Sequence, residues 1–196
     1  MDAGDVRTKR DIRRRIRDAR RALSAGAVAD ADRRIATRAL ALAGGLGART
    51  VACYLAAPQE PPTSAFLAAA RARGIRVILP LSRPGGRLAW ADDDGTSRTG
   101  PLGVPEPAGP ALGGDPLAEA HLVLAPAAAV DARGTRLGWG LGYYDRALAA
   151  LAALAAPPPV YAVIYDVEVV DALPRESHDV PMSGALTPAR TLSFDR

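Results

Sequence analysis

Short apolar runs alternate with helical patterns along most of this chain, and this alternation narrows the choice of fold more than any other feature. Buried strands are expected where the apolar runs lie, at residues 50–55, 75–79, 121–125 and 160–165. Helices are expected at residues 63–73 and 143–155. Strands that alternate with helices usually pair in parallel, with the helices covering both faces. The sequence therefore predicts an α/β fold with a three-layer, mostly parallel sheet flanked by helices, and ligands beyond the carboxyl ends of its strands.

Two further helices are expected near the N-terminus. The first spans residues 7–23, because its apolar residues recur at helical spacing and share one face: Ile12, Ile16, Ala19 and Leu23. Arginines occupy the rest of its surface. Ser24 is a suitable N-cap for a second helix, which should end at about residue 42, before the pair Gly44 and Gly45. Together the two helices predict a basic N-terminal helical arm.

The chain has the size and composition of one soluble domain over residues 1–196, with 48% hydrophobic residues. Its single cysteine, Cys53, excludes an internal disulfide and lies in an apolar run, which favours packing in a reducing compartment. No apolar run approaches the roughly 18 residues that a membrane helix needs. We therefore expect a cytoplasmic protein with no membrane partner. Residues 83–118 predict a long irregular segment in which only residues 87–91 resemble a strand.

Basic residues outnumber acidic ones, which gives a formal net charge of +4 and an isoelectric point near 9.7. Such a charge is compatible with a nucleic-acid-binding module that uses the arginine-rich first helix. Lys9 is the only lysine, however, so the arginine excess also fits a bias in codon usage. Aromatic residues make up 5% of the chain, which is low for a protein that stacks bases. We expect no nucleic-acid partner and keep nucleic-acid binding as an alternative.

The segment from Arg136 to Asp145 carries the strongest chemical signal in the sequence. Glycines stand at alternate positions in it, at 138, 140 and 142, and a helix is expected directly after them. Backbone without side chains lets several N–H groups approach one anion, and the helix N-terminus adds its positive dipole end. This pattern favours a phosphate site with Arg136 as a bidentate partner. The segment lacks the Gly-Lys-Ser/Thr of a Walker loop, and Tyr143 stands where a dinucleotide fingerprint needs glycine or alanine. A structural glycine turn is the alternative.

Several ordered motifs extend this signal over most of the chain. They are residues 124–131 with Gly134 and 136–146, residues 54–60 with Thr63, residues 103–107, residues 173–174 and residues 178–181. In this order they resemble the signature of the 5-formyltetrahydrofolate cyclo-ligase family. The resemblance implies an enzyme that uses ATP and Mg²⁺ to convert 5-formyltetrahydrofolate into 5,10-methenyltetrahydrofolate, with release of ADP and phosphate. It also implies a phosphorylated formyl intermediate, because oxide is too poor a leaving group to depart unaided.

The resemblance also implies roles for individual residues. ATP contacts are implied for Lys9, Arg10, Arg13, Arg136, Gly138, Trp139, Gly140, Leu141, Gly142, Tyr143, Tyr144 and Asp145. Folate contacts are implied for Leu55, Glu60, Trp139, Gly140, Leu141, Gly142 and Tyr143. Catalytic roles are implied for Lys9, Arg13, Arg136 and Tyr144. Mg²⁺ ligation is implied for Asp145 and Asp179, whose oxygens suit this hard cation. Relatives usually have glycine or lysine at position 141, so Leu141 departs from the family's pattern.

Each of these residues also has an explanation that needs no ligand. Lys9 and Arg13 lie one helical turn apart and would form a solvated basic face. Glu60 would be a surface carboxylate, and Asp145 a favourable charge in the first turn of a helix. For the whole protein, a nucleotide sensor without catalysis is a further alternative, because a fold does not guarantee an activity.

Overall fold

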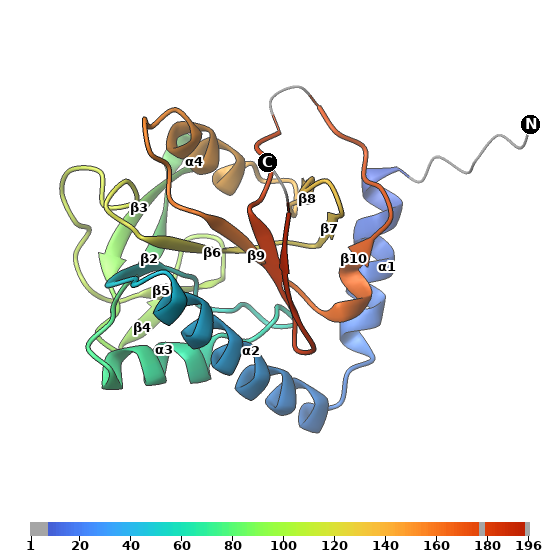
Figure 1. The fold of residues 1–196 in the computed structure, drawn as a ribbon, viewed down its shortest axis with the longest axis horizontal. Helices are drawn as coiled ribbons and strands as arrows, with labels where there is room; N and C mark the ends of the chain where they lie inside the picture. Colours follow the sequence, from blue (N-terminus) through green and yellow to red (C-terminus); the bar gives the residue numbers. More distant parts are fainter. Residues whose placement is uncertain (1–7, 177–178, 195–196) are drawn as a thin grey trace, which may run out of the picture.

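One main sheet of seven strands organises the computed structural model, which describes residues 8–176 and 179–194 (Figure 1). From one edge to the other the strands are β12 (Thr191–Ser193), β11 (Gly184–Leu186), β9 (Val160–Val163), β6 (Leu122–Pro126), β1 (Thr50–Ala52), β2 (Arg76–Arg83) and β3 (Arg87–Asp92). Neighbours from β11 to β2 pair in parallel, whereas the edge strands β12 and β3 pair antiparallel. The predicted α/β fold with a mostly parallel sheet is confirmed.

Helices cover both faces of the main sheet. On one face lie α2 (Ala25–Gly45) and α3 (Ser64–Ala72), and on the other lies α4 (Tyr143–Ala152) (Figure 1). Strand β6 builds a core on each side, because its side chains alternate between the two faces. Leu122 and Leu124 pack on the side of α2 and α3, while Val123 and Ala125 pack on the side of α4. The predicted three-layer arrangement is confirmed.

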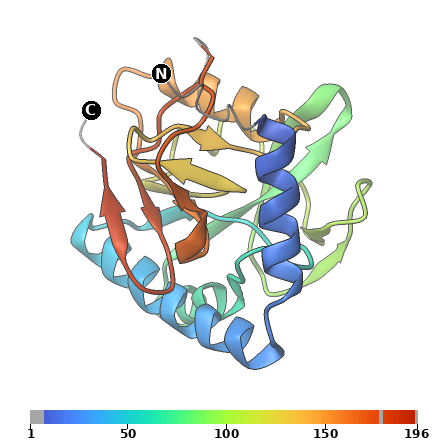
Figure 2. The same cartoon turned by 90° about the vertical axis from the view of Figure 1, so that its right-hand side faces the viewer.

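A smaller sheet carries the first helix. It consists of β10 (Val169–Val170), β7 (Ala129–Asp131) and β8 (Arg136–Leu137). The helix α1 (Lys9–Arg21) lies beside it (Figure 2), and Ile12 and Ile16 pack there against Ala129 and Leu137. The predicted basic N-terminal helical arm is not confirmed as a unit. Helix α2 is a layer of the main core, and α1 is attached to the small sheet by these apolar contacts.

The buried face of α1 differs from the predicted one in its C-terminal half. Ile12 and Ile16 are buried as expected. Ala19 and Leu23 are exposed, and Arg20 is buried in their place. Burial of an arginine inside a core requires a charged partner at close range.

That partner is Glu168, which lies 148 residues away along the chain. Arg20 Nε donates to Glu168 Oε1 over 2.6 Å, and Arg20 Nη2 donates to Glu168 Oε2 over 2.8 Å. Arg20 Nη2 also donates to Ala127 O over 2.8 Å, while Glu168 Oε2 also accepts from the Tyr165 N–H. The pair therefore joins α1 to segments that follow β6 and β9.

Several element ends differ from the predicted ones. Helix α2 continues through Gly44 and Gly45, and the chain turns only after Leu46, at Gly47, whose φ is +60°. The segment 83–118 holds, besides the expected strand β3, a hairpin of β4 (Ser97–Thr99) and β5 (Pro105–Pro107). The other expected strands and helices are confirmed with shifted ends.

Two predictions drawn from composition can also be compared with the structure. Cys53 is fully buried in the core, as expected, and burial raises the pKa of its thiol to about 12. The thiol is therefore protonated and unreactive at neutral pH. Among the helices of the described residues, none has the length and apolar character to span a bilayer.

We expect Glu168→Gln to lower the free energy of unfolding by about 3–5 kcal/mol, because the Arg20 guanidinium would stay buried without a charged partner. Chemical denaturation of the wild type and the variant measures the difference. Asp18→Asn is the control, since Asp18 forms an exposed ion pair with Arg21 at 3.6 Å. Loss of such a pair costs less than about 1 kcal/mol. Equal effects of the two substitutions would contradict the importance of the buried pair.

Candidate active site

A cavity of about 160 Å³ lies at the carboxyl edge of the main sheet, where β1, β2 and β6 end. It is lined by Tyr54, Leu55, Glu60, Pro80, Ser82, Leu88, Leu102, Val104, Pro105, Glu106, Pro126, Arg136, Gly138, Trp139, Gly140, Leu141, Gly142, Tyr143, Tyr144 and Asp145. The topology of a parallel sheet predicts a ligand site at this edge. Most of the residues that the sequence marked as site residues meet here.

The glycine loop, residues 138–142, forms one side of the cavity and connects β8 to α4. Gly140 and Gly142 have backbone φ angles of +96° and +73°, which L-residues with a side chain rarely adopt. Helix α4 begins at Tyr143, as predicted, with Gly142 as its N-cap. The cavity is therefore lined by bare backbone next to a helix N-terminus, the combination that suits a phosphate group.

Side chains of α1 contact the glycine loop. Arg13 Nε donates to Gly138 O over 2.7 Å. The centroid of the Trp139 ring lies 5.0 Å from Arg20 Cζ and 5.8 Å from Arg17 Cζ, within the range of cation–π attraction. Arginines of the first helix thus position the loop by contacting two of its groups, the Gly138 carbonyl and the Trp139 ring.

Arg136 lies in the cavity wall and forms an ion pair with Asp145. Its Nη1 donates to Pro126 O over 3.0 Å, and its Cζ lies 6.0 Å from the centroid of the Tyr144 ring. The Arg136 side chain is 5% exposed, whereas that of Asp145 is 50% exposed. A guanidinium fixed in this way is suited to bind an anionic group in the cavity.

Three buried polar atoms of the cavity-lining residues have no hydrogen-bond partner within the described chain: Glu106 Oε2, Trp139 Nε1 and Tyr144 OH. Buried polar groups are almost always paired, so a cluster of exceptions indicates a ligand site. Burial also raises the pKa of Tyr144 well above its usual value, which keeps its hydroxyl protonated as a donor. Sequence reasoning missed Glu106, whose only signal was its place in the motif at 103–107.

Glu60 lies between this cavity and a neighbouring groove of about 600 Å³, and Leu55 also lines both. The Ala57 N–H donates to Glu60 Oε2 over 2.9 Å. Burial raises the pKa of Glu60 above its ordinary value of 4.5, against the lowering effects of that N–H and of Arg20. The two residues expected to contact folate outside the glycine loop therefore lie in the same site as the loop.

Lys9 and Arg10, two of the residues expected to contact ATP, do not line the main cavity. Lys9 Nζ lies 2.7 Å from Glu176 Oε1 and 3.9 Å from Asp179 Oδ2. Arg10 is exposed on the first turn of α1. The structure thus brings Lys9 to the segment around Asp179, while Arg10 faces solvent.

The two residues expected to bind a metal, Asp145 and Asp179, line one small cavity together with Arg136. Residues 8–176 and 179–194 contain no group of three or more His, Cys, Asp or Glu side chains that would form a metal site alone. Two carboxylates still fit Mg²⁺, which usually binds one or two of them together with phosphates and waters. His178, in the same motif as Asp179, lies outside the described residues.

Comparison with known proteins identifies the family. The family model of the 5-formyltetrahydrofolate cyclo-ligases matches residues 5–188. The chain belongs to this family. It is 40% identical over 151 residues to the 5-formyltetrahydrofolate cyclo-ligase of Mycolicibacterium smegmatis, covering 74% of this chain and 76% of that protein. It is 31% identical over 179 residues to the Escherichia coli cyclo-ligase, covering 89% of this chain and 97% of that protein. The resemblance carried by the sequence motifs is confirmed.

Solved structures share the cyclo-ligase fold of this chain. The 5,10-methenyltetrahydrofolate synthetase of Aquifex aeolicus superposes with a TM-score of 0.78 at 22% identity, over 96% of this chain and 93% of that one. The synthetase of Mycoplasma pneumoniae gives a TM-score of 0.73 at 22% identity, over 96% and 99% of the two chains. At this level of identity the likeness supports the fold.

We expect Glu60→Gln to raise the stability of this cyclo-ligase near pH 7 but not near pH 4. The raised pKa means that the folded protein binds this proton more tightly than the unfolded chain does. The protonated Glu60 carboxyl therefore stabilises the folded wild type fully below pH 4.5, and this contribution is lost as the pH rises through the folded-state pKa. Glutamine keeps an acceptor for the Ala57 N–H and removes the charge. Melting temperatures of both proteins at the two pH values measure the effect, and a difference independent of pH would contradict it.

Proposed function

We propose that this chain converts 5-formyltetrahydrofolate into 5,10-methenyltetrahydrofolate in a reaction that consumes ATP and releases ADP and phosphate. Membership of the cyclo-ligase family supports the folate reaction. The single observation that carries the nucleotide part is the glycine loop. Its bare backbone, the N-terminus of α4 and the Arg136 guanidinium line one cavity.

The chemistry explains why ATP is needed. The formyl oxygen must leave while N10 of the substrate closes on the formyl carbon, and oxide is too basic to leave. The oxygen therefore attacks the γ-phosphorus of ATP, and ADP departs. N10 attacks the carbon of the resulting imidate phosphate, the C–O bond breaks, phosphate leaves with the oxygen, and N10 loses its proton. Because phosphoryl transfer leaves little covalent chemistry to the protein, catalysis consists mainly of positioning and charge neutralisation.

In the proposed ATP site, backbone N–H groups of the glycine loop and Arg136 bind the phosphates. Arg13 lies next to the loop, and Lys9 contacts phosphate after exchange from its ion pair with Glu176. The buried Tyr144 hydroxyl, which has no other partner in the described chain, donates to an oxygen of the transferred phosphoryl group. The remaining proposed ATP contacts are Arg10, Gly138, Trp139, Gly140, Leu141, Gly142, Tyr143 and Asp145.

The proposed folate site adjoins the ATP site in the same cavity. Leu55 and Glu60 contribute from the loop that follows β1, and Trp139 to Tyr143 contribute from the glycine loop. Asp145 and Asp179 would hold Mg²⁺ at the neighbouring small cavity. There the ion would neutralise negative charge on the phosphate oxygens.

One assay tests the proposed function. Protein, Mg-ATP and 5-formyltetrahydrofolate are mixed, and the near-ultraviolet absorbance of the methenyl product is followed together with phosphate release. We expect product only when ATP and Mg²⁺ are both present. Product formation at full rate without nucleotide would overturn the ATP dependence. Nucleotide binding without folate-dependent phosphate release would indicate a sensor, and salt-dependent retention on DNA or RNA without turnover would indicate a nucleic-acid-binding module.

We expect Gly140→Ala to raise the KM for ATP by about tenfold or more, because a Cβ would hinder the approach of phosphate to the backbone. Gly74→Ala is a matched control, since Gly74 also has a positive φ, +69°, and ends α3 outside the cavity. Both substitutions should lower the unfolding free energy by about 1–2 kcal/mol through the same backbone strain. Steady-state kinetics and denaturation of both variants measure the two effects. Equal KM values for ATP in the Gly140→Ala and Gly74→Ala variants would show that the loop has only a structural role.

We expect Asp145→Asn to raise the Mg²⁺ concentration for half-maximal rate by roughly tenfold or more, and Asp179→Asn to act in the same direction. Asparagine keeps the shape and one oxygen but loses the charge that binds a hard cation. Titration of Mg²⁺ at fixed ATP measures the change, and Asp30→Asn on the exposed side of α2 is the control. Superimposable curves for the wild type and both site variants would remove the two aspartates from the metal site.

A further inference from the structure

Glu106 is a buried carboxylate whose hydrogen bonding is only half complete. It lies on β5 and is 2% exposed. The Ser82 N–H of β2 donates to its Oε1 over 2.8 Å. Its Oε2 is buried and has no partner in the part of the chain that the structure describes. A buried polar atom without a partner destabilises the folded state, so this oxygen lacks a structural explanation.

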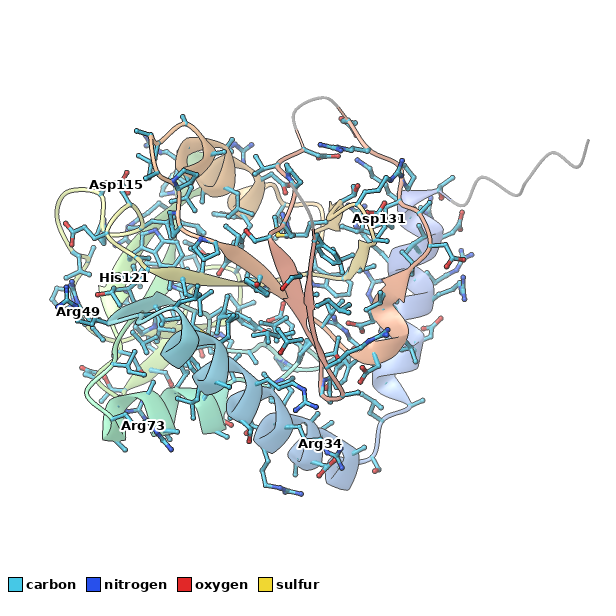
Figure 3. The ribbon with its side chains drawn as sticks, in the orientation of Figure 1. Arg34, Arg49, Arg73, Asp115, His121 and Asp131 are labelled. Carbon is cyan, nitrogen blue, oxygen red and sulfur yellow. The ribbon has the colours of Figure 1, made fainter. Side chains whose placement is uncertain are left out.

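The other two fully buried carboxylates of the described residues are completely paired. Both oxygens of Glu168 accept from Arg20, and one also accepts from the Tyr165 N–H. Asp131, labelled close to α1 in Figure 3, accepts backbone N–H bonds from Arg133, Thr135 and Leu173. Carboxylates that stabilise this fold thus use both oxygens, and Glu106 differs from them.

The neighbouring chain leaves space for the Glu106 side chain. A Cβ added at Gly100 would overlap the Glu106 carboxylate. Gly100 does not have a positive φ, so its backbone conformation is open to any residue. The absence of a side chain at position 100 is therefore explained by the carboxylate beside it.

The surroundings of Glu106 indicate what kind of ligand would complete its bonding. It shares the cavity with Glu60 and with apolar residues, among them Leu88, Leu102 and Val104. Because carboxylates only accept hydrogen bonds, these two side chains favour a ligand with N–H donors on more than one edge over a phosphate group, which the glycine loop and Arg136 bind in the proposed ATP site. A reduced pterin ring carries such donors at its 2-amino group, N3 and N8. Adenine carries one amino group, flanked by acceptor nitrogens that would face a carboxylate.

We propose that Glu106 recognises the reduced pterin ring of the folate substrate by accepting a hydrogen bond from one of its N–H groups through Oε2. Oε1 keeps its bond to the Ser82 N–H, which fixes the carboxylate in the cavity wall. The proposal rests on the proposed folate reaction and adds a residue that determines its substrate specificity. The unpaired oxygen then has its partner in the complex.

Direct binding of 5-formyltetrahydrofolate without nucleotide tests this assignment, because it does not depend on turnover. Calorimetry gives the Kd for the wild type, Glu106→Gln and Asp131→Asn, and melting curves give their stability without ligand. For Glu106→Gln we expect a Kd about tenfold or more higher, from the lost bond to a charged group. Its ATP affinity should be unchanged, and its melting temperature equal or higher. For Asp131→Asn we expect a lower melting temperature and a folate Kd close to that of the wild type.

Other results would overturn the assignment. An unchanged folate Kd in Glu106→Gln removes Glu106 from the folate site and leaves the proposed function intact. A selective loss of ATP affinity assigns the residue to the nucleotide instead. If the wild-type protein does not bind 5-formyltetrahydrofolate, both the proposed function and the role of Glu106 are contradicted. If Glu106→Gln does not fold, Gly100→Ala decides, because its Cβ displaces the carboxylate and leaves its charge in place. A selectively raised folate Kd there supports the assignment, and an unchanged one overturns it.

Discussion

The buried ion pair between Arg20 and Glu168 joins the first helix to the rest of the fold, and the geometry of the site depends on it. The two residues are 4% and 0% exposed. Charges removed from water to this extent are tolerated only at close range, and here the nearest N and O atoms are 2.6 Å apart. The pair therefore fixes α1 against the segment that follows β9. Because Arg20 also lies against the Trp139 ring, the same pair positions the glycine loop.

The glycine loop needs support from other elements, because residues without side chains cannot fix their backbone by packing. On the side of α1, Arg13 donates to Gly138 O. On the side of α4, the Arg146 guanidinium lies beside Gly142 and donates to Gly86 O in the turn between β2 and β3 over 3.2 Å. Arginines thus position the loop from its surroundings, while the loop itself keeps the bare backbone that a phosphate requires.

The elements that could be predicted from the sequence are those with a complete local signal, such as the apolar run of β6 and the helix that begins at Tyr143. Strands such as β8 have only two residues and form because a neighbour pairs with them, so they show no period of their own. The site residues from Arg136 to Asp145 were found because they are contiguous and form a complete local signal. Arg20 and Glu106 were not, because their burial depends on partners on other elements that no local pattern shows.

The volume of the cavity limits how the two substrates of the proposed reaction would bind. The cavity volume of about 160 Å³ is smaller than the roughly 300–1,000 Å³ of typical small-molecule sites. The adjoining groove provides about 600 Å³ more, and both spaces are lined by Leu55, Glu60 and Pro105. The folate and the nucleotide of the proposed reaction would together need both spaces. Leu102 and Leu141, which also line the cavity, are 44% and 63% exposed, so a bound substrate can bury apolar surface that folding leaves in water. The unpaired buried atoms of Glu106, Trp139 and Tyr144 lie in the same cavity. Folding thus leaves both apolar surface and hydrogen bonds incomplete at one place, where binding of substrate can complete them.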